Sequence, residues 1–207
     1  MPSAFISFEG IDGCGKSTQI ARVARHLEEA GIDCLCLREP GGTAISEQIR
    51  ALVLDNKHAE MSTVCELLLY EAARAQLVHE LIAPALDAGK VVLCDRFYDS
   101  TTAYQAYAGG LDVAQVQLAN QLAAGNCHPD VTLVFDLSPE CAAARSQARG
   151  TSDRIEAKGL GYQQRVAAGF RAIAEADSAR VKLVDATGTV DEVFERVLTL
   201  VAERVGL

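Results

Sequence analysis

The sequence predicts an α/β protein with a phosphate-binding loop (P-loop), built in three layers from a parallel sheet of about five strands with helices on both faces. Two observations support this fold class. Short apolar runs alternate with longer segments in which apolar residues recur at helical spacing, which is typical of βαβ units. Residues 10–18, GIDGCGKST, match the pattern G-x-x-x-x-G-K-[ST] in full.

The individual elements follow from these patterns. Apolar runs predict strands at residues 4–8, 34–37, 91–94, 132–136 and 181–184. Helical spacing predicts helices at residues 17–30, 44–54, 62–88, 113–124, 139–148, 161–176 and 190–205. Ser62 is the expected N-cap of the third helix, and Pro84 is a candidate kink in it. Gly31, Gly89 and Gly125 stand where helix ends favour a left-handed residue. The chain has no evident repeat, low-complexity tract or linker, so we expect one domain over residues 1–207.

The composition limits the possible partners. Of the 207 residues 49% are hydrophobic but only 5% aromatic, with no Trp, which indicates a largely aliphatic core. The net charge of −9 argues against a surface that coats nucleic acid or a polybasic membrane patch. No apolar stretch approaches the roughly 18 residues of a membrane helix, and the N-terminus enters a predicted strand without a signal-like segment. We therefore expect a cytoplasmic protein.

The seven cysteines are an odd number without a Cys-x-x-Cys pair, which gives no sign of zinc or redox chemistry. Cys34, Cys36 and Cys94 lie in predicted strands and are expected to be small buried hydrophobes in a reducing compartment. Cys14 lies within the loop at residues 10–18, where a helix N-terminus could lower its pKa, but its side chain is expected to pack inward.

The loop at residues 10–18 lies between a predicted buried strand and a predicted helix. This context argues against a glycine-rich turn that matches the motif by chance. Glycines let such a loop fold around an anion so that backbone N–H groups point at phosphates. Lys16 is expected to reach the β- and γ-phosphates, and the Ser17 hydroxyl to bind Mg²⁺. The expected nucleoside triphosphate-binding residues are Gly10, Ile11, Asp12, Gly13, Cys14, Gly15, Lys16, Ser17 and Thr18.

Asp95 follows the apolar run at residues 91–94. Many phosphate-loop proteins have an acidic residue at the end of such a strand, and its carboxylate helps to hold Mg²⁺ directly or through water. Arg96 comes next and has two interpretations. It could form a plain salt bridge with Asp95, or its guanidinium could grip phosphate oxygens in bidentate fashion. The nearby phosphate loop favours the second interpretation.

Two loops interrupt the regular alternation. Residues 38–42, REPGG, follow the second predicted strand, and ligands of open parallel sheets sit beyond the carboxyl ends of strands. This loop is therefore a candidate second-substrate site. Residues 149–154 are polar and rich in arginine, as expected of a mobile flap. Tyr70 and Arg74 share one helix face and could together bind a base, but taken alone the pair favours a core-edge tyrosine and a solvated arginine.

Five segments taken in order resemble bacterial thymidylate kinases: residues 9–18 (EGIDGCGKST), 38–42 (REPGG), 70–77 (YEAARAQL), 95–105 (DRFYDSTTAYQ) and 148–154 (ARGTSDR). They span roughly three-quarters of the chain, and the REPGG and DRF…AYQ segments are far more specific than a phosphate loop alone. The resemblance implies a nucleoside monophosphate kinase fold. It further implies an enzyme that uses Mg²⁺ and transfers phosphate from ATP to dTMP to give ADP and dTDP. It also implies a homodimer.

The resemblance further implies roles for single residues on the acceptor side. Asp12 corresponds to the acidic residue that accepts a hydrogen bond from the sugar 3′-hydroxyl. Arg50 and Arg96 correspond to the arginines that hold the acceptor phosphate, with Arg38 close by. Tyr70 stands where the family usually stacks a Phe on thymine, so its extra hydroxyl needs a partner.

The base-reading and lid residues follow in the same way. Arg74 corresponds to the residue that faces the base O4, Thr101 and Gln105 to residues on the thymine edge, and Tyr104 to the tyrosine that blocks a 2′-hydroxyl. Some members carry an arginine inside the phosphate loop, where this chain has Gly13 and Cys14. The chain is thus similar to the branch with an arginine in the lid, at about residues 145–160. Arg149 aligns best with the lid arginine of that branch, and Arg145 and Arg154 are the alternatives. The implied catalytic residues are Lys16, Asp95, Arg96 and Arg149.

Three alternatives remain on the sequence alone. A kinase for a different nucleoside or nucleotide is disfavoured by the set Tyr70, Arg74, Thr101 and Gln105. A GTPase-type switch would need Asn-Lys-x-Asp, but the only Asn-Lys, at residues 56–57, continues as His-Ala. A DNA-bound ATPase fits poorly with the charge of −9. Residues 186–188, after the last predicted strand, are candidates for the adenine site by position only.

Overall fold

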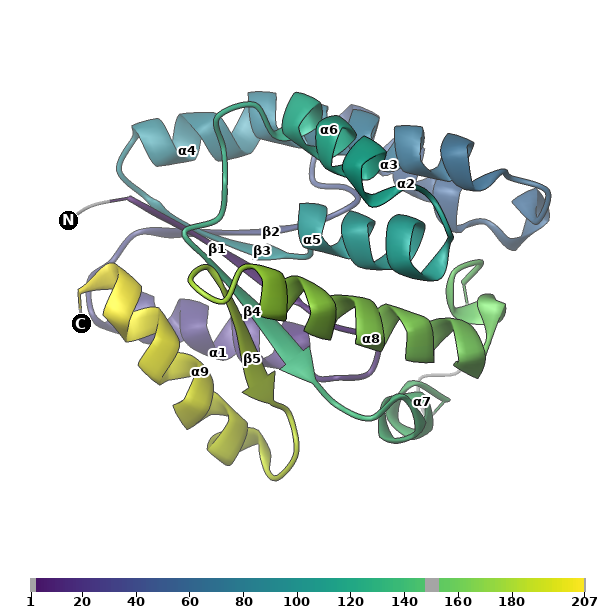
Figure 1. Cartoon of the computed structure of the whole chain (residues 1–207). Coiled ribbons are helices and arrows are strands. Elements are labelled where there is room, and N and C mark those ends of the chain that lie inside the picture. Colours follow the sequence, from purple (N-terminus) through teal and green to yellow (C-terminus); the bar gives the residue numbers. More distant parts are fainter. Residues whose placement is uncertain (1–2, 148–152, 207) are drawn as a thin grey trace.

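Parallel strands form the centre of the molecule, in the order β2-β3-β1-β4-β5 (Figure 1). This computed structural model describes residues 3–147 and 153–206. The strands are β1 (Ala4–Glu9), β2 (Cys34–Arg38), β3 (Val91–Asp95), β4 (Val131–Asp136) and β5 (Val181–Asp185). All five predicted strands are confirmed, and each differs from its predicted range by one residue at one end. Because the strands are parallel, their charged last residues lie along one edge of the sheet.

Helices cover both faces, which confirms the predicted α/β fold (Figure 1). The α1 and α9 helices pack on one face, and α4, α5 and α8 on the other, with α2, α3 and α6 stacked beyond them. The α-helices are α1 (Lys16–Glu29), α2 (Ala44–Leu54), α3 (Thr63–Leu77), α4 (Ala83–Asp87), α5 (Tyr98–Thr101), α6 (Val113–Ala124), α7 (Pro139–Gln147), α8 (Leu160–Ala176) and α9 (Val190–Val205). Short 3₁₀ turns lie at η1 (Asn56–His58) and η4 (Glu156–Lys158). None of the helices within residues 3–147 and 153–206 is long and apolar enough to cross a membrane.

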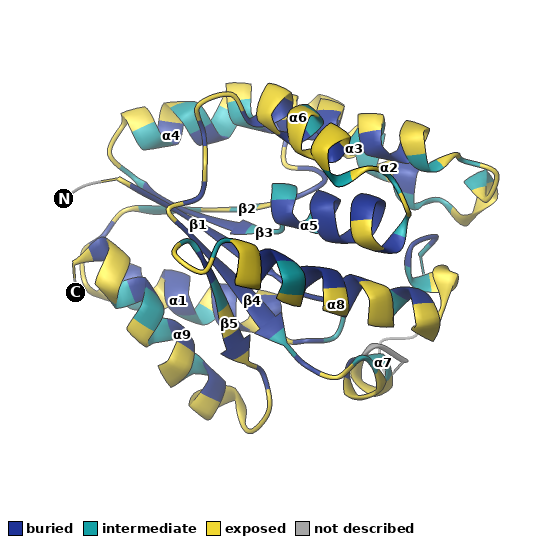
Figure 2. Cartoon of the chain, viewed as in Figure 1, coloured by how far each residue is buried: buried dark blue, intermediate teal, exposed yellow. Residues whose placement is uncertain are grey.

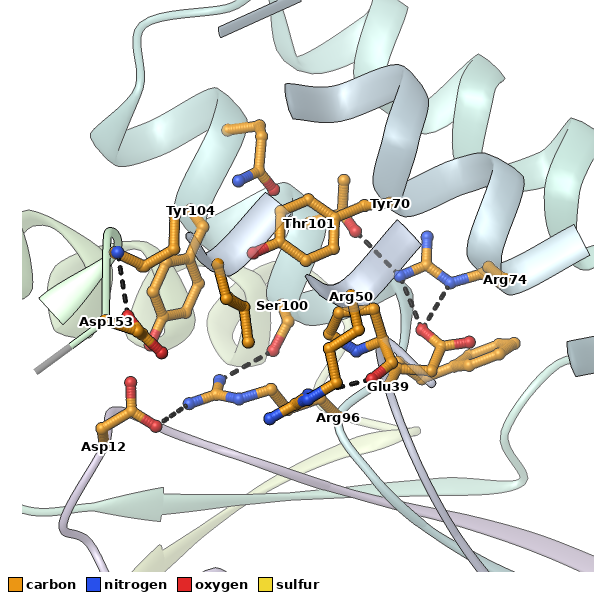
Figure 3. Close-up of a pocket in the computed structure, with 15 residues that line it drawn as sticks. Asp12, Glu39, Arg50, Tyr70, Arg74, Arg96, Ser100, Thr101, Tyr104 and Asp153 are labelled. Carbon is orange, nitrogen blue, oxygen red and sulfur yellow. Dashed lines mark hydrogen bonds and ion pairs between the residues drawn. The ribbon is translucent and has the colours of Figure 1, made fainter. Parts of the chain in front are cut away.

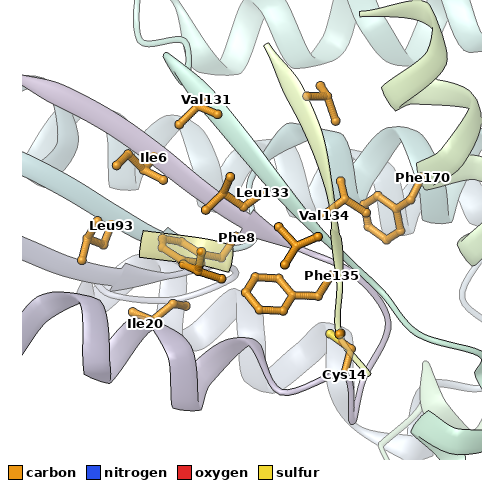
Figure 4. Close-up of a cluster of buried hydrophobic side chains, with 14 of the residues drawn as sticks. Ile6, Phe8, Cys14, Ile20, Leu93, Val131, Leu133, Val134, Phe135 and Phe170 are labelled. Atoms are coloured by element: carbon orange, nitrogen blue, oxygen red, sulfur yellow. The ribbon is translucent and has the colours of Figure 1, made fainter. Parts of the chain in front are cut away.

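The core is built mainly from aliphatic side chains of the sheet and of the helices on it (Figure 4). The Phe8 and Phe135 rings stack with centroids 6.2 Å apart at its centre. Cys14 is buried in this cluster, as expected, and so is Cys94 within the sheet. Cys36 was expected to be buried but is exposed, and Cys34 is only half-buried. The expectation was wrong because β2 is an edge strand, so its apolar run is covered on fewer sides.

The predicted helix at residues 62–88 is divided into three parts. Ser62 caps its start by accepting a hydrogen bond from the Cys65 backbone N–H at 3.2 Å, as predicted. A π-helical turn, η2 (Val78–Ile82), separates α3 from α4. Pro84 lies in the first turn of α4, where its missing N–H costs least. The interruption therefore comes before Pro84, in the π turn.

The helical segment that follows β3, where α5 continues into the π-helical η3 (Thr102–Ala108), was not predicted from the sequence. Most of its side chains are buried, polar ones included (Figure 2). A helix that is buried all round shows no apolar stripe, so its sequence carries no helical period. The residues concerned, YDSTTAYQAYA, are also rich in Thr and Tyr, which are not strong helix formers.

A buried polar network fixes α5 against the sheet. Arg180, just before β5, pairs with Asp99 of α5 through Nη1 to Oδ2 at 2.6 Å and Nη2 to Oδ1 at 3.0 Å. The Thr132 hydroxyl of β4 donates to Asp99 Oδ2 at 2.9 Å and lies 2.8 Å from the Ser7 hydroxyl of β1. The network therefore joins β1, β4 and the start of β5 to the short helix α5.

Substituting Arg180→Ala should therefore destabilise the protein strongly. The Asp99 side chain, only 4% exposed, would lose its positive partner, and breaking a buried pair in this way typically costs about 3–5 kcal/mol. Urea unfolding measures the loss. The matched control is Arg171→Ala, which removes an ion pair with Asp136 whose side chains are 50% and 32% exposed and should cost at most about 1 kcal/mol. Equal losses in the two variants would contradict this account.

Candidate active site

The phosphate loop joins the end of β1 to the start of α1, and its conformation requires glycine. Gly15, the N-cap of α1, has φ +101° and leaves the start of the helix without a side-chain cap. Gly10 has φ +131°, and a Cβ there would lie 2.8 Å from the Phe135 carbonyl oxygen. The uncapped backbone N–H groups at the start of α1 suit an anion.

Lys16 and Ser17 lie where the loop meets the helix. The buried Lys16 Nζ donates to the carbonyls of Gly10 at 2.9 Å and Ile11 at 3.1 Å, which holds the ammonium inside the loop. Ser17 Oγ donates to Asp95 Oδ2 at 2.7 Å. The two predicted Mg²⁺ ligands are thus side by side, and a hydroxyl with one carboxylate suits a cation that keeps several waters. Within residues 3–147 and 153–206, no group of three or more His, Cys, Asp or Glu is arranged to hold a metal.

These groups line the first of two adjoining pockets, the phosphate-loop pocket. The second, the inner pocket, lies against α3 and α5–η3 and holds the predicted base-reading residues Tyr70, Arg74, Thr101, Tyr104 and Gln105 (Figure 3). Both pockets are lined by Asp12, Glu39, Arg50 and Arg96. The two pockets therefore meet beside two arginines, Arg50 and Arg96.

Arg96 lies at this junction in a constrained position (Figure 3). Its φ of +71° falls in the left-handed region, which is rare for a residue other than glycine. Its Nη2 donates to Asp12 Oδ1 at 2.7 Å and its Nη1 to Ser100 Oγ at 3.0 Å, and its guanidinium lies 5.2 Å from the Tyr104 ring centroid. The carboxylate that pairs with Arg96 is therefore on the phosphate loop rather than at the neighbouring position 95.

Glu9, which was not singled out from the sequence, is linked to Arg96 through Ser100. Its buried carboxyl accepts hydrogen bonds from the Phe97 N–H at 2.7 Å and from the Ser100 hydroxyl. Burial and the nearby charge of Asp99 raise the pKa of Glu9 to about 8. The sequence signal was only a glutamate at the end of an apolar run, and nothing in that pattern shows that the side chain is fully buried.

Arg74 is buried among carboxylates rather than solvated, so the simpler interpretation of the Tyr70–Arg74 pair was wrong. Its Nε donates to Glu39 Oε2 at 2.9 Å and its Nη1 to both oxygens of Glu71 at 2.7 and 2.8 Å. Its Nη2 donates to Thr101 Oγ1 at 2.9 Å. The guanidinium is therefore fixed at the wall of the inner pocket.

The other predicted arginines lie nearer the phosphate loop. Arg50 Nη1 donates to the Pro40 carbonyl at 2.9 Å, and its guanidinium lines both pockets. Arg38 Nη2 donates to both carboxylate oxygens of Glu47 at 2.9 Å, and Arg38 lines the phosphate-loop pocket but not the inner one. Burial lowers the pKa of Arg50 below its ordinary value, although the group remains cationic.

The three lid arginines are placed differently. Arg149 lies outside the described residues. Arg145, on α7, lines the phosphate-loop pocket. Arg154 is buried in an ion pair with Glu66 instead. A Cβ at Gly13 would lie 2.2 Å from the Ala142 carbonyl oxygen of α7, so the loop has no room there for an arginine.

The fold and the loop define the class: an α/β P-loop protein with a second ligand pocket beside the phosphate site. The family model described as "Thymidylate kinase" matches residues 8–197. Relatives named thymidylate kinase are 47% identical in Syntrophotalea carbinolica (94% of this chain, 93% of the relative) and 48% identical in Symbiobacterium thermophilum (97% and 94%). A crystal structure of thymidylate kinase from Ehrlichia chaffeensis aligns with TM-score 0.80 and 32% identity, over 97% of this chain and 99% of that one. The chain belongs to the thymidylate kinase family.

The raised pKa of Glu9 predicts a pH-dependent stability. The folded protein holds this proton up to about pH 8, whereas the unfolded chain releases it near the ordinary value of 4.5. Between these values the folded state binds more protons, so rising pH lowers its stability. The free energy of unfolding of the parent minus that of Glu9→Gln should therefore fall steadily from about pH 5 to about pH 8.

Urea unfolding at several pH values measures this difference, and a difference independent of pH would refute the assignment. Glu47→Gln is the control. A hydrogen bond from the Gly42 N–H lowers the pKa of Glu47, so its contribution changes only below its ordinary value of 4.5 and should be flat over the same range.

Proposed function

We propose that this chain transfers the γ-phosphoryl group of ATP to dTMP, giving ADP and dTDP for thymidine nucleotide biosynthesis. The observation that carries the proposal is the pair of adjoining pockets that share Arg50 and Arg96. Phosphoryl transfer needs two phosphates brought together with positive charge around them, and little covalent chemistry from the protein.

The donor side is the phosphate-loop pocket. Backbone N–H groups of residues 10–18 and Lys16 would hold the ATP phosphates, with Ser17 and Asp95 on Mg²⁺. When bound, Mg²⁺ neutralises charge on the β- and γ-phosphate oxygens. In this structure the Lys16 ammonium donates hydrogen bonds to the carbonyls of Gly10 and Ile11. A short rotation of the side chain would turn the ammonium toward a phosphate in the pocket.

The acceptor side is the inner pocket. Arg50 and Arg96 would hold the dTMP phosphate, and Asp12, already paired with Arg96, the sugar 3′-hydroxyl. Tyr70 would stack on thymine, while Arg74, Thr101 and Gln105 face its edge and Tyr104 blocks a 2′-hydroxyl. A donor fixed opposite a keto oxygen discriminates against an amino group there, because the amino group would leave it unpaired.

The remaining positive charge would come from the lid at residues 145–160. Because the loop has no space at Gly13 and buries Cys14, an arginine from the lid must approach the transferring group. Arg149 remains our choice, and Arg145, which lines the phosphate-loop pocket, is the next candidate. Arg154 is a weaker candidate because its buried ion pair holds it away from that pocket.

We further propose a cytoplasmic homodimer of single-domain chains. All seven cysteines are free thiols, which suits a reducing compartment. The adjacent helices α2, α3 and α6 expose large apolar side chains that a second copy could cover. These are Ile45, Leu52, Val64, Leu68, Leu118 and Leu122.

A coupled assay with ATP, Mg²⁺ and a panel of monophosphates tests the function. We expect dTMP to be phosphorylated faster than dUMP, dCMP, dAMP or dGMP. Lys16→Ala should lower kcat by a factor of hundreds, since removing such an electrostatic contact typically costs about 3–4 kcal/mol in the transition state. Circular dichroism checks its folding. A folded Lys16→Ala protein with parent kcat, or no preference for dTMP in the parent, would reject the proposal.

Arg149→Ala should slow the chemical step by orders of magnitude and leave the dTMP dissociation constant almost unchanged. The reason is that a lid arginine stabilises charge only as the phosphoryl group moves. Single-turnover kinetics separates this step from product release. If phosphoryl transfer in Arg149→Ala runs at the parent rate while Arg145→Ala is slow, the role belongs to Arg145.

A further inference from the structure

Glu66, on α3, is a buried carboxylate that collects three donors from distant parts of the chain. It is 1% exposed and accepts hydrogen bonds from Gln105 Nε2 at 2.9 Å, from Arg154 Nη2 at 2.5 Å and from Lys158 Nζ at 2.9 and 3.0 Å. Burial opposes its ionisation, yet the hydrogen bonds of Gln105 and Lys158 and the charge of Arg154 lower the pKa of Glu66. The group is thus a carboxylate that can only accept hydrogen bonds.

Two of these donors come from residues 153–162, called the arm here, which join the end of the lid to the first turn of α8. Arg154 also donates its Nε to the Val53 carbonyl at 2.8 Å and its backbone N–H to the Leu54 carbonyl at 3.2 Å, so it satisfies the last turn of α2. At the far end of the arm, Tyr162 Oη donates to the Tyr104 carbonyl at 2.8 Å. The arm is therefore tied to α2, α3 and η3 together.

The same arm forms part of the inner pocket. Asp153 and Ile155 line it, and Figure 3 shows Asp153 opposite Asp12, next to Tyr104. The third donor, Gln105, belongs to η3 and lines the pocket as well. One carboxylate is thus shared between the arm and a residue at the predicted base edge.

We propose that Glu66 is a positioning residue that orients the Gln105 amide for base selection and couples it to the arm at residues 153–162. The inference rests on the proposed function. Since Glu66 can only accept, it holds Gln105 Nε2, and the amide oxygen is left as the acceptor toward the pocket. An acceptor there matches the N3–H of thymine and opposes cytosine, whose N3 is itself an acceptor.

The test is selectivity. Glu66→Gln keeps the shape but can donate, so the Gln105 amide loses its imposed orientation. The ratio of kcat/KM for dTMP to kcat/KM for dCMP should fall at least about tenfold, mainly through KM for dTMP, while KM for ATP changes less than about twofold. Glu175→Gln makes the same charge change on the exposed surface of α8 and should keep the parent ratio.

A double-mutant cycle separates positioning from general loosening. In a Gln105→Ala background, Glu66→Gln should cause no further loss of the ratio, because the residue it acts through is gone. Equal losses in both backgrounds would overturn the proposal, as would a folded Glu66→Gln with the parent ratio. A parent enzyme without preference for dTMP over dCMP would instead reject the proposed function.

Hydrogen exchange tests the coupling without a variant of Glu66, should that variant fail to fold. Saturating dTMP should slow exchange at residues 156–162 in the parent, although none of them lines the inner pocket. The slowing should be much weaker in Gln105→Ala at its own saturating dTMP concentration. Equal slowing in both proteins would show that the arm responds independently of Gln105, and the coupling would be rejected.

Discussion

Carboxylates that hold arginines in single orientations are the interaction on which both pockets depend. A guanidinium has five N–H donors on a long flexible stem, so one partner rarely fixes it. In a chain with a net charge of −9, acidic side chains are plentiful, and those at the site act as acceptors that aim positive charge. The arrangement explains how an acidic protein builds pockets suited to anions. The pairs at the two pockets are Arg38–Glu47, Arg74–Glu39, Arg74–Glu71 and Arg96–Asp12.

The sequence was sufficient wherever the signal is local. Strands buried on both faces appear as apolar runs, and the phosphate loop is a contiguous motif, so β1, α1 and the Ser17–Asp95 pair were predictable. The partners of the arginines were not. Glu39 and Glu66 are far from Arg74 and Arg154 in sequence, and a glutamate gives no local sign of burial. The segment α5–η3 after β3 was missed for a related reason. Because it is buried on most sides, its apolar residues do not recur at helical spacing in the sequence.

Packing at the phosphate loop leaves no space for a long side chain at positions 13 and 14. The Ala142 carbonyl of α7 lies against Gly13, and Cys14 fills a place in the core beneath. Neither position can present a long side chain without displacing α7 or opening the core. In the proposed reaction, positive charge for the transferring group would then come from outside the loop, and we propose the lid at residues 145–160 as its source. Under this proposal, the close approach of α7 to Gly13 is the reason why the arginine comes from the lid and not from the loop.

The π-helical turn η3 also has a consequence for how such a pocket can evolve. Each π turn holds one residue more than an α turn, and this extra residue sets the angle at which Tyr104 and Gln105 leave the helix. Deleting one residue there would restore regular bonding and rotate the side chains beyond it by about 100°, given 3.6 residues per turn. A substitution changes one side chain of the pocket wall, whereas a change of chain length would turn every side chain that follows it in the helix. A change of chain length in η3 would therefore alter the pocket more than a single substitution does.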